Sequence, residues 1–283
     1  MPRWLSIVTR RKITLAGVVI MLFTLCVGVL APVIAGNPTH MDVQARLARP
    51  SAMHWFGTDD VGRDVYSRVV YGARLSLIVG VAVVLFSFVF GLAAGLAAGF
   101  YRVLDNPVMR VMDGLMAFPA IILAIALMAS LGPSVLNVIV AIGVVYTPRV
   151  ARVVRGSVLV VRETAYVEAA RALGVSDAGL IARHVLPNCL SPVIVQGSFV
   201  FAAAVLTEAA LSFLGVGVPP YIASWGNVLS EGRLYIQQAP WLVLYPGGAI
   251  MVTILGLNLF GDGLRDLLDP KIRGVQTERQ RAA

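Results

Sequence analysis

The stretch IVGVAVVLFSFVFGLAAGLAAGF, residues 78–100, carries no charged side chain from end to end. A bilayer core needs roughly 20 apolar residues of helix to be crossed. Backbone groups in lipid must also be satisfied within the segment, so the stretch predicts a transmembrane helix. Composition extends this expectation to the whole chain. Of its 283 residues, 58% are hydrophobic and 13% charged, whereas soluble domains carry about 25% charged residues.

Five further apolar runs predict the remaining helices. They cover residues 13–35, 114–131, 133–148, 191–217 and 241–261, and Glu208 is the charged residue among them. We therefore expect an all-α membrane protein with six transmembrane helices. The first run follows Arg10, Arg11 and Lys12, but it exceeds the roughly 7–15 residues of a signal-peptide core. We interpret it as a retained anchor.

The basic residues predict the orientation of these helices. Cytoplasmic loops carry an excess of Lys and Arg. With a cytoplasmic N-terminus, only six of the 23 basic residues fall outside: Arg46, Arg49, Arg63, Arg68, Arg74 and Arg233. Both termini are thus predicted to be cytoplasmic. We divide the chain into residues 1–72 (tail, first helix and outer segment), a five-helix core at 73–269, and a cytoplasmic tail at 270–283.

Several functions are disfavoured by what the sequence lacks. Neither lysine, Lys12 or Lys271, follows a glycine, so there is no Gly-Lys-Ser/Thr phosphate loop for ATP. The basic residues lie between apolar runs, which argues against nucleic acid as a partner. Cys26, Cys189 and the three histidines show neither disulfide nor metal-ligand spacing. We expect no metal, no cofactor and no catalytic residue in this chain.

A glycine stripe marks one helix for close packing. Gly91, Gly95 and Gly99 recur every four residues within the first stretch. This spacing places them on one side of a helix, where another backbone can approach closely. Packing inside the bundle and a subunit interface are both compatible with the pattern.

Prolines predict two irregular helices. Pro119 is expected to kink the third helix near its start, and Pro246-Gly247-Gly248 is expected to interrupt the sixth. Such breaks are tolerated where protein or a wet cavity takes up the freed hydrogen bonds. Pro246 is therefore a candidate for a translocation path, although proline also occurs in purely structural membrane helices.

Three polar residues within or beside the apolar runs are expected to need hydrogen-bond or ion-pair partners. Burying the charge of Glu208 costs at least about 2.5 kcal/mol, so it should face the bundle interior or water. It either lines a path for polar solutes or holds two helices together. Asn258, a further candidate for the path, is placed to bond across helices. Asp113 is expected to pair with Arg110, three residues earlier.

The outer segment, residues 37–71, is long enough for structure of its own. Thr58-Asp59-Asp60 offers a helix cap followed by acids in the first turn. Val61, Val65 and Val69 would then share a face. The pattern predicts a short amphipathic helix at the outer surface, which either contacts a soluble donor protein or packs as a lid on the bundle.

A polar segment separates the fourth and fifth helices. Residues 166–173 contain good helix formers, and Gly174 permits the left-handed turn that ends a helix. Ser176-Asp177 caps a second short helix towards Val185, and Leu186-Pro187 is expected to end it. Two short helices on the inner membrane face form a knob that fits a groove of a partner; an ordinary solvated loop is the alternative.

These residues resemble a known signature. Glu168-Ala169-Ala170, Gly174 and Leu186-Pro187, at this spacing between spans, resemble the EAA signature of bacterial ABC importer permeases. Residues 54–68 (HWFGTDDVGRDVYSR) look like the outer segment of the dipeptide/oligopeptide/nickel permease family, C-type subunit. Residues 210–215 (ALSFLG) and 261–270 (GDGLRDLLDP) are similar to further motifs of that group.

The resemblance implies the type I ABC importer permease fold in the bacterial inner membrane, within membrane lipid. Its implied partners are a homologous second permease, two ATPase subunits that bind ATP and Mg²⁺, and a periplasmic binding protein. The loop at residues 156–188 would couple to the ATPase through Glu168, Ala169, Ala170, Gly174, Leu186 and Pro187. The implied cargo is dipeptides or oligopeptides; nickel chelates, glutathione and opines are alternatives. A gradient-driven secondary transporter and a non-transporting scaffold are the rival classes.

Overall fold

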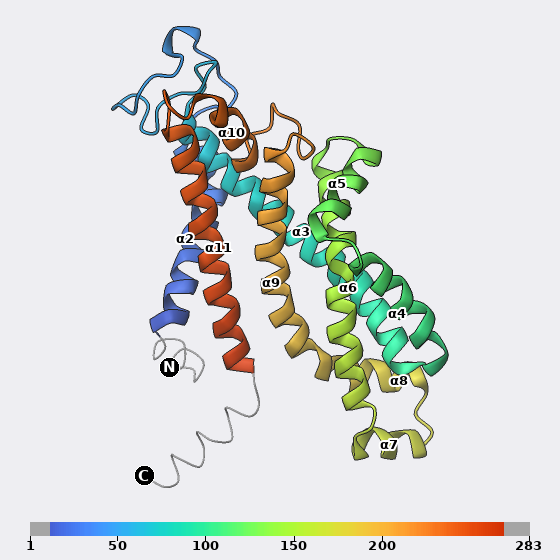
Figure 1. Ribbon diagram of the computed structural model, residues 1–283. Coiled ribbons are helices and arrows are strands. Elements are labelled where there is room, and N and C mark those ends of the chain that lie inside the picture. The colour runs from blue at the N-terminus through green and yellow to red at the C-terminus, as the bar shows by residue number, and fades with distance from the viewer. Residues whose placement is uncertain (1–11, 269–283) are drawn as a thin grey trace, which may run out of the picture.

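The computed structural model describes residues 12–268, a bundle of long helices with short helices at both ends (Figure 1). The long helices are α2 (Lys12–Ile34), α3 (Val65–Phe100), α4 (Arg102–Met116), α5 (Ala120–Leu131), α6 (Val135–Val161), α9 (Leu186–Phe213) and α11 (Trp241–Leu268). The short ones are η1 (Val43–Ala45), α7 (Ala165–Ala172), α8 (Asp177–Leu180), η2 (Ile181–Val185), α10 (Trp225–Gly232) and η3 (Arg233–Tyr235). The tails expected at the two termini, including residues 270–283, lie outside the described residues.

Within residues 12–268, five helices are long and apolar enough to cross a membrane, or six if α4 and α5 count as one bent span. The third predicted helix, residues 114–131, is broken near its start, where Pro119 was expected to kink it. The chain turns by 91° between α4 and α5, with Pro119 at the N-cap of α5. Proline holds the preceding residue, Phe118, out of the helical region. The 12 residues of α5 reach about 18 Å, less than the roughly 30 Å of a bilayer core.

The second predicted helix begins much earlier than its apolar run. Helix α3 has 36 residues and is capped by Asp64, whose Oδ2 accepts from the Ser67 N–H at 2.8 Å. The amphipathic helix expected from residue 58 is wrong. Asp59 Oδ1 instead accepts from two backbone N–H groups, those of Val61 at 3.0 Å and Arg63 at 2.8 Å. These bonds fold residues 58–64 into a turn outside the helix.

Two other prolines lie inside helices that continue past them. Helix α6 continues past Pro148 to Val161, and α11 runs through Pro246 without a break. The predicted interruption at Pro246-Gly247-Gly248 is therefore wrong. Pro246 lies near the start of α11. Because proline has no backbone N–H, only one carbonyl group of the helix loses its hydrogen-bond donor there. Its ring is buried.

The glycine stripe packs inside the bundle, against α6. A Cβ atom at each glycine would lie 2.5–2.7 Å from the Cβ of a valine: Gly91 faces Val150, Gly95 faces Val154 and Gly99 faces Val158. Residues without side chains thus let the two backbones approach closely. The intra-bundle interpretation is the one the structure bears out.

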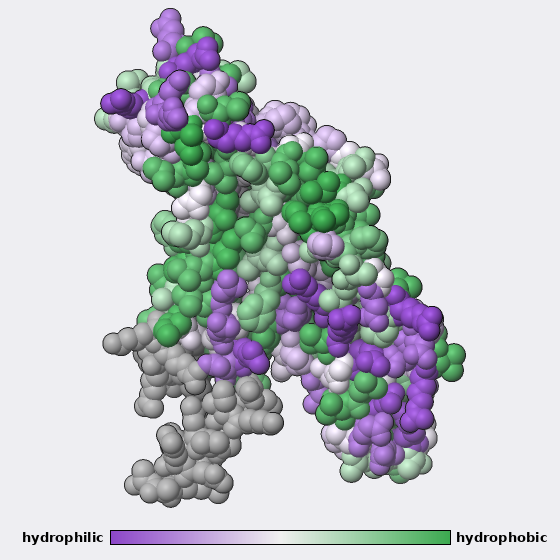
Figure 2. All heavy atoms as spheres, in the orientation of Figure 1, coloured by the Kyte–Doolittle hydropathy of each residue, from purple (hydrophilic) through white to green (hydrophobic). Residues whose placement is uncertain are grey.

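Two apolar clusters hold the helices together. The larger joins α3, α5, α6 and α9, and the smaller joins the start of α3 to α9, α10 and α11. Figure 2 shows a hydrophobic band around the middle of the molecule, between hydrophilic surfaces at the two ends. The start of α2, the end of α11 and helices α7 and α8 lie at one end, and residues 37–64 with α10 lie at the other (Figure 1).

Candidate functional site

The segment between α6 and α9, residues 162–185, is anchored to the bundle by three buried side chains. Val167 of α7, Leu180 of α8 and Val185 are each 0% exposed and join the larger apolar cluster. Thr164 precedes α7 in an extended conformation, and its hydroxyl donates to the Val161 carbonyl at 2.6 Å. This segment, which we call the coupling segment, is therefore packed on the bundle.

The opposite side of α7 is open. Glu168 and Ala169 are exposed, Ala170 is half-buried, and Leu173 is 85% exposed. Within the described part of the chain, the Glu168 carboxylate makes neither a hydrogen bond nor an ion pair. Gly174 ends the helix with φ +83°, as its sequence position predicts, and has open space around it. The Glu168 carboxylate on α7 and the Leu173 side chain at the C-cap of α7 are thus both exposed.

The second helix of the segment differs from the prediction. Ser176 caps α8, accepting from the Gly179 N–H at 3.3 Å, as expected. Leu186-Pro187 does not end the helix, because α8 passes through one π-helical turn directly into α9. Pro187 directly follows this π-helical turn, as the second residue of α9. Leu186 is half-buried and Pro187 is exposed.

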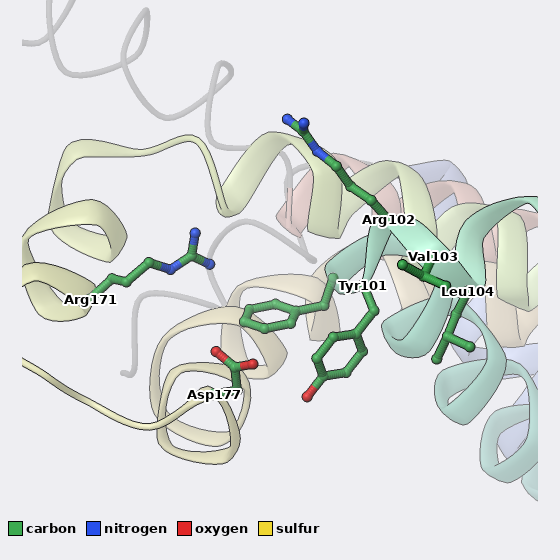
Figure 3. A pocket seen from close by; sticks show the side chains of 7 residues that line it. Tyr101, Arg102, Val103, Leu104, Arg171 and Asp177 are labelled. Carbon is green, nitrogen blue, oxygen red and sulfur yellow. The ribbon is translucent and has the colours of Figure 1, made fainter.

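Two arginines of the coupling segment contact the C-terminal end of α3. The Arg162 Nη1 group donates to the Gly99 carbonyl at 2.7 Å. The Arg171 guanidinium lies 5.6 Å from the centre of the Phe100 ring. Arg171 and Asp177 face the α3–α4 turn across a pocket of about 520 Å³, lined by residues 100–104 on the other side (Figure 3).

Ion pairs join α4 to α6 near the same end. Arg155 binds both carboxylate oxygens of Asp105, at 2.5 and 2.7 Å. Arg152 binds Asp113 Oδ1 at 2.6 Å. The predicted pairing of Asp113 with Arg110 is therefore wrong: α4 packs on α6, which brings Arg152 to the carboxylate and leaves Arg110 exposed.

Glu208 is fully buried in α9, with 0% exposure. Its Oε1 accepts from the Ser212 hydroxyl at 2.8 Å, and that hydroxyl in turn accepts from the Val218 N–H at 3.3 Å. Its Oε2 has no hydrogen-bond partner among the described residues. The carboxyl group thereby supports the turn that follows α9, through a side chain one helical turn further along.

The three candidates for a translocation path lie on two helices, α9 and α11. Glu208 and Pro246 are buried in different helices, and Asn258 is exposed on α11. Within residues 12–268, no hydrogen bond joins any two of them. Asn258, expected to bond across helices, makes no such bond in this part of the chain.

A cluster of ion pairs between the start of α3, the turn before it and α10 was not predicted from the sequence. Arg68 is 1% exposed, and its Nη1 lies 2.6 Å from Asp59 Oδ2. Arg63 Nε binds the same Asp59 oxygen at 2.6 Å. Both arginines also bind Glu231 of α10. Asp59, Asp60 and Glu231 lie close enough together to share a cation, but two guanidinium groups already supply that charge.

Residues 87–274 match the family described as the binding-protein-dependent transport system inner membrane component. The chain belongs to this family. It is thus an inner-membrane permease component of a binding-protein-dependent transport system. The matched region contains the coupling segment, the glycine stripe and Glu208.

Curated relatives extend the match over nearly the whole permease. A Brucella suis protein named as a peptide transport system permease is 51% identical over 265 residues, covering 93% of this chain and 90% of the relative. The dipeptide transport system permease of Alkalihalophilus pseudofirmus is 45% identical and covers 93% and 88%. The glutathione transport system permease of Pectobacterium atrosepticum is 43% identical and covers 79% and 75%.

A solved structure shares the fold of the permease. A chain of the MetNI methionine ABC transporter, from an inward-facing crystal form, superposes with a TM-score of 0.60. It is 19% identical, and the match covers 71% of this chain and 96% of that one. The similarity shows that this chain shares the fold of that transporter chain.

Proposed function

We propose that this permease is the membrane subunit of an ATP-driven ABC importer for dipeptides, oligopeptides or related small solutes. A second, homologous permease would complete the path through the membrane. Two separate ATPase subunits would bind ATP and Mg²⁺, and a periplasmic binding protein would deliver the solute. This chain supplies the path and contributes no catalytic residue.

The observation that carries the proposal is the exposed face of α7. Glu168 is exposed on α7 and Leu173 is exposed at its C-cap, while Val167 packs the buried side of the helix against the bundle. A short amphipathic helix of this kind fits a groove in a partner, with apolar anchors and a charge to set its register. Residues 168–170, Gly174 and Leu186-Pro187 are the contact we assign to the ATPase.

The placement of the chain ends supports a cytoplasmic position for both termini. The start of α2 and the end of α11 lie at the same end of the bundle as α7 (Figure 1). The excess of arginine on this side also favours the cytoplasm. The coupling segment would then face the compartment that holds ATP.

At the opposite end, residues 37–64 form a platform suited to a binding protein. The turn is fixed by its ion pairs, and by the Trp241 indole N–H, which donates to the Thr58 carbonyl at 3.1 Å. Met53 and Trp55 are 87% and 63% exposed on its surface. Large exposed apolar side chains on a rigid frame favour a protein contact.

Peptides are the favoured cargo because most of the similar permeases are named for peptide transport, including those of Brucella suis and Alkalihalophilus pseudofirmus. Glutathione, itself a short peptide, is the second candidate, favoured by the 43% identity to the Pectobacterium protein. Nickel chelates and opines are not favoured by any of these relatives.

Co-purification with the ATPase subunits tests the proposal. The complex, expressed with a tag on this chain, should retain the ATPase, and Glu168→Lys should release most of it while the permease still folds. Arg152→Gln, which removes an exposed arginine outside the coupling segment, is the control and should retain the ATPase. Retention by Glu168→Lys equal to wild type, in both detergent and nanodiscs, would reject α7 as the contact.

A further inference from the structure

Helix α3 is fastened at both ends by residues that lie far away in the sequence. Its 36 residues extend about 54 Å at 1.5 Å per residue, well beyond a bilayer core of roughly 30 Å. Its two ends therefore stand at opposite membrane surfaces. Helix α3 contacts both the coupling segment and the outer cap, residues 37–64 with α10; α9, which follows η2 directly and packs on α10, does so as well.

At the inner end, the coupling segment caps α3. The last four carbonyl groups of a helix lack partners within it, and one of them, Gly99 O, accepts from Arg162 at 2.7 Å. Arg171 adds a second guanidinium over the Phe100 ring. Cations near a helix C-terminus also interact favourably with its dipole. Both arginines come from the segment assigned to the ATPase contact.

At the outer end, α10 is bound to the first two turns of α3. The Trp225 indole N–H donates to the Val69 carbonyl at 2.8 Å, and both groups are buried. Arg68 binds Glu231 of α10. The ring of Trp225 also fills the space left by Gly72, where a Cβ would meet it at 2.6 Å. Movement of α3 along or about its axis therefore acts directly on α10.

Between these two ends, α3 packs along α6. The glycine stripe of α3 packs against α6 and leaves no room for α3 to slide without α6, since a Cβ added at Gly95 would lie 2.5 Å from Val154 Cβ and 2.6 Å from the Ala151 carbonyl oxygen. Closely packed interiors have discrete arrangements and transmit displacement. The helix contains no proline, and prolines are among the common causes of sharp kinks.

From these contacts we infer that α3 transmits movement of the coupling segment to α10. Arg162 and Phe100 are the positioning residues at its inner end, and Trp225 and Glu231 are those at its outer end. The inference rests on the proposed function, because the ATPase supplies the movement. It adds an outer element, α10, whose position is set by the nucleotide state of subunits on the other side of the membrane.

The test measures movement at α10 in the complete transporter reconstituted in nanodiscs. A spin label at Leu234, 75% exposed just after α10, and a second at Met53 report their separation with and without ATP and vanadate. Wild type should show an ATP-dependent change. Arg162→Gln and Phe100→Leu remove the inner contacts, and Trp225→Phe removes the outer hydrogen bond. Each variant should lower the fraction of molecules whose label separation changes with ATP by roughly two- to tenfold. This factor corresponds to the loss of one hydrogen bond or one cation–π contact.

Control variants distinguish a loss of transmission through α3 from a failure of the proposed function. Arg152→Gln removes an arginine of α6 that pairs with α4 rather than α3, and it should respond like wild type. Loss of ATPase binding or the absence of any response in wild type would count against the proposed function. An unchanged response in Arg162→Gln, Phe100→Leu and Trp225→Phe, with wild type responding, would overturn the inference alone.

Discussion

The contact between α3 and α6 predicts the effect of adding one methyl group. In Gly95→Ala, the new Cβ would lie 2.5 Å from Val154 Cβ and 2.6 Å from the Ala151 carbonyl oxygen. Carbon atoms prefer separations of about 3.5–4.0 Å. One of these neighbours is backbone and the other is attached directly to it, so neither can rotate away. The helices must separate by about 1 Å.

The magnitude follows from two opposing terms. Overpacking a tight interior costs about 1–3 kcal/mol, and replacing glycine by alanine in a helix gains up to about 1 kcal/mol. We therefore expect Gly95→Ala to lower the free energy of unfolding by about 1–2 kcal/mol. For a chain of this size, that is a fall in Tm of roughly 2–8 °C.

Thermal unfolding of the purified permease in detergent, followed by tryptophan fluorescence, measures the change. Gly156→Ala is the matched control, since this glycine lies in α6 with nothing within 4 Å of an added Cβ. It should keep or raise the Tm. A Gly95→Ala protein as stable as the Gly156→Ala protein would refute the close packing assigned to the stripe.

The other predictions concern buried and surface polar groups. Glu208→Gln keeps an oxygen acceptor for Ser212 and should leave the Tm near wild type, whereas Glu208→Ala leaves that hydroxyl unpaired and should cost about 1–3 kcal/mol. Equal Tm values for the two variants would exclude the support of the turn after α9. Arg155→Gln should cost at most about 1 kcal/mol, because the pair with Asp105 is partly exposed. That loss should shrink as salt is raised; a loss independent of salt would contradict an ionic contribution.

The sequence predicted those features that depend on neighbouring residues. Long apolar runs located the membrane helices, and the period of Gly91, Gly95 and Gly99 located a tight contact. Gly174 and Ser176 predicted the end of α7 and the start of α8. Each of these depends on local backbone geometry or on one helix face. The resemblance carried by residues 54–68, 168–187 and 261–270 agrees with the family assignment.

Features that depend on distant partners were not predicted. The uncharged run begins at residue 78 because Arg68 and Arg74 precede it. In the structure the helix starts at Val65, and Arg68 is paired with Asp59 and with Glu231, which is 163 positions away. Asp113 was assigned to a neighbour on its own helix, although α6 supplies Arg152. The π-helical turn at residues 181–185 let α8 continue past Pro187. In each case tertiary contacts outweighed the local preference.

The central claim, that α7 couples this permease to an ATPase, is tested most directly by ATP-driven uptake of a labelled dipeptide into vesicles containing the whole transporter. Gly174→Asp and Glu168→Lys should leave the permease folded and abolish most uptake, while the ATPase continues to hydrolyse ATP. Gly215→Asp, with the same positive φ and open surroundings at the other end of α9, controls for backbone strain and should retain uptake. Wild-type uptake by both coupling-segment variants, or uptake by this chain without an ATPase, would contradict the account.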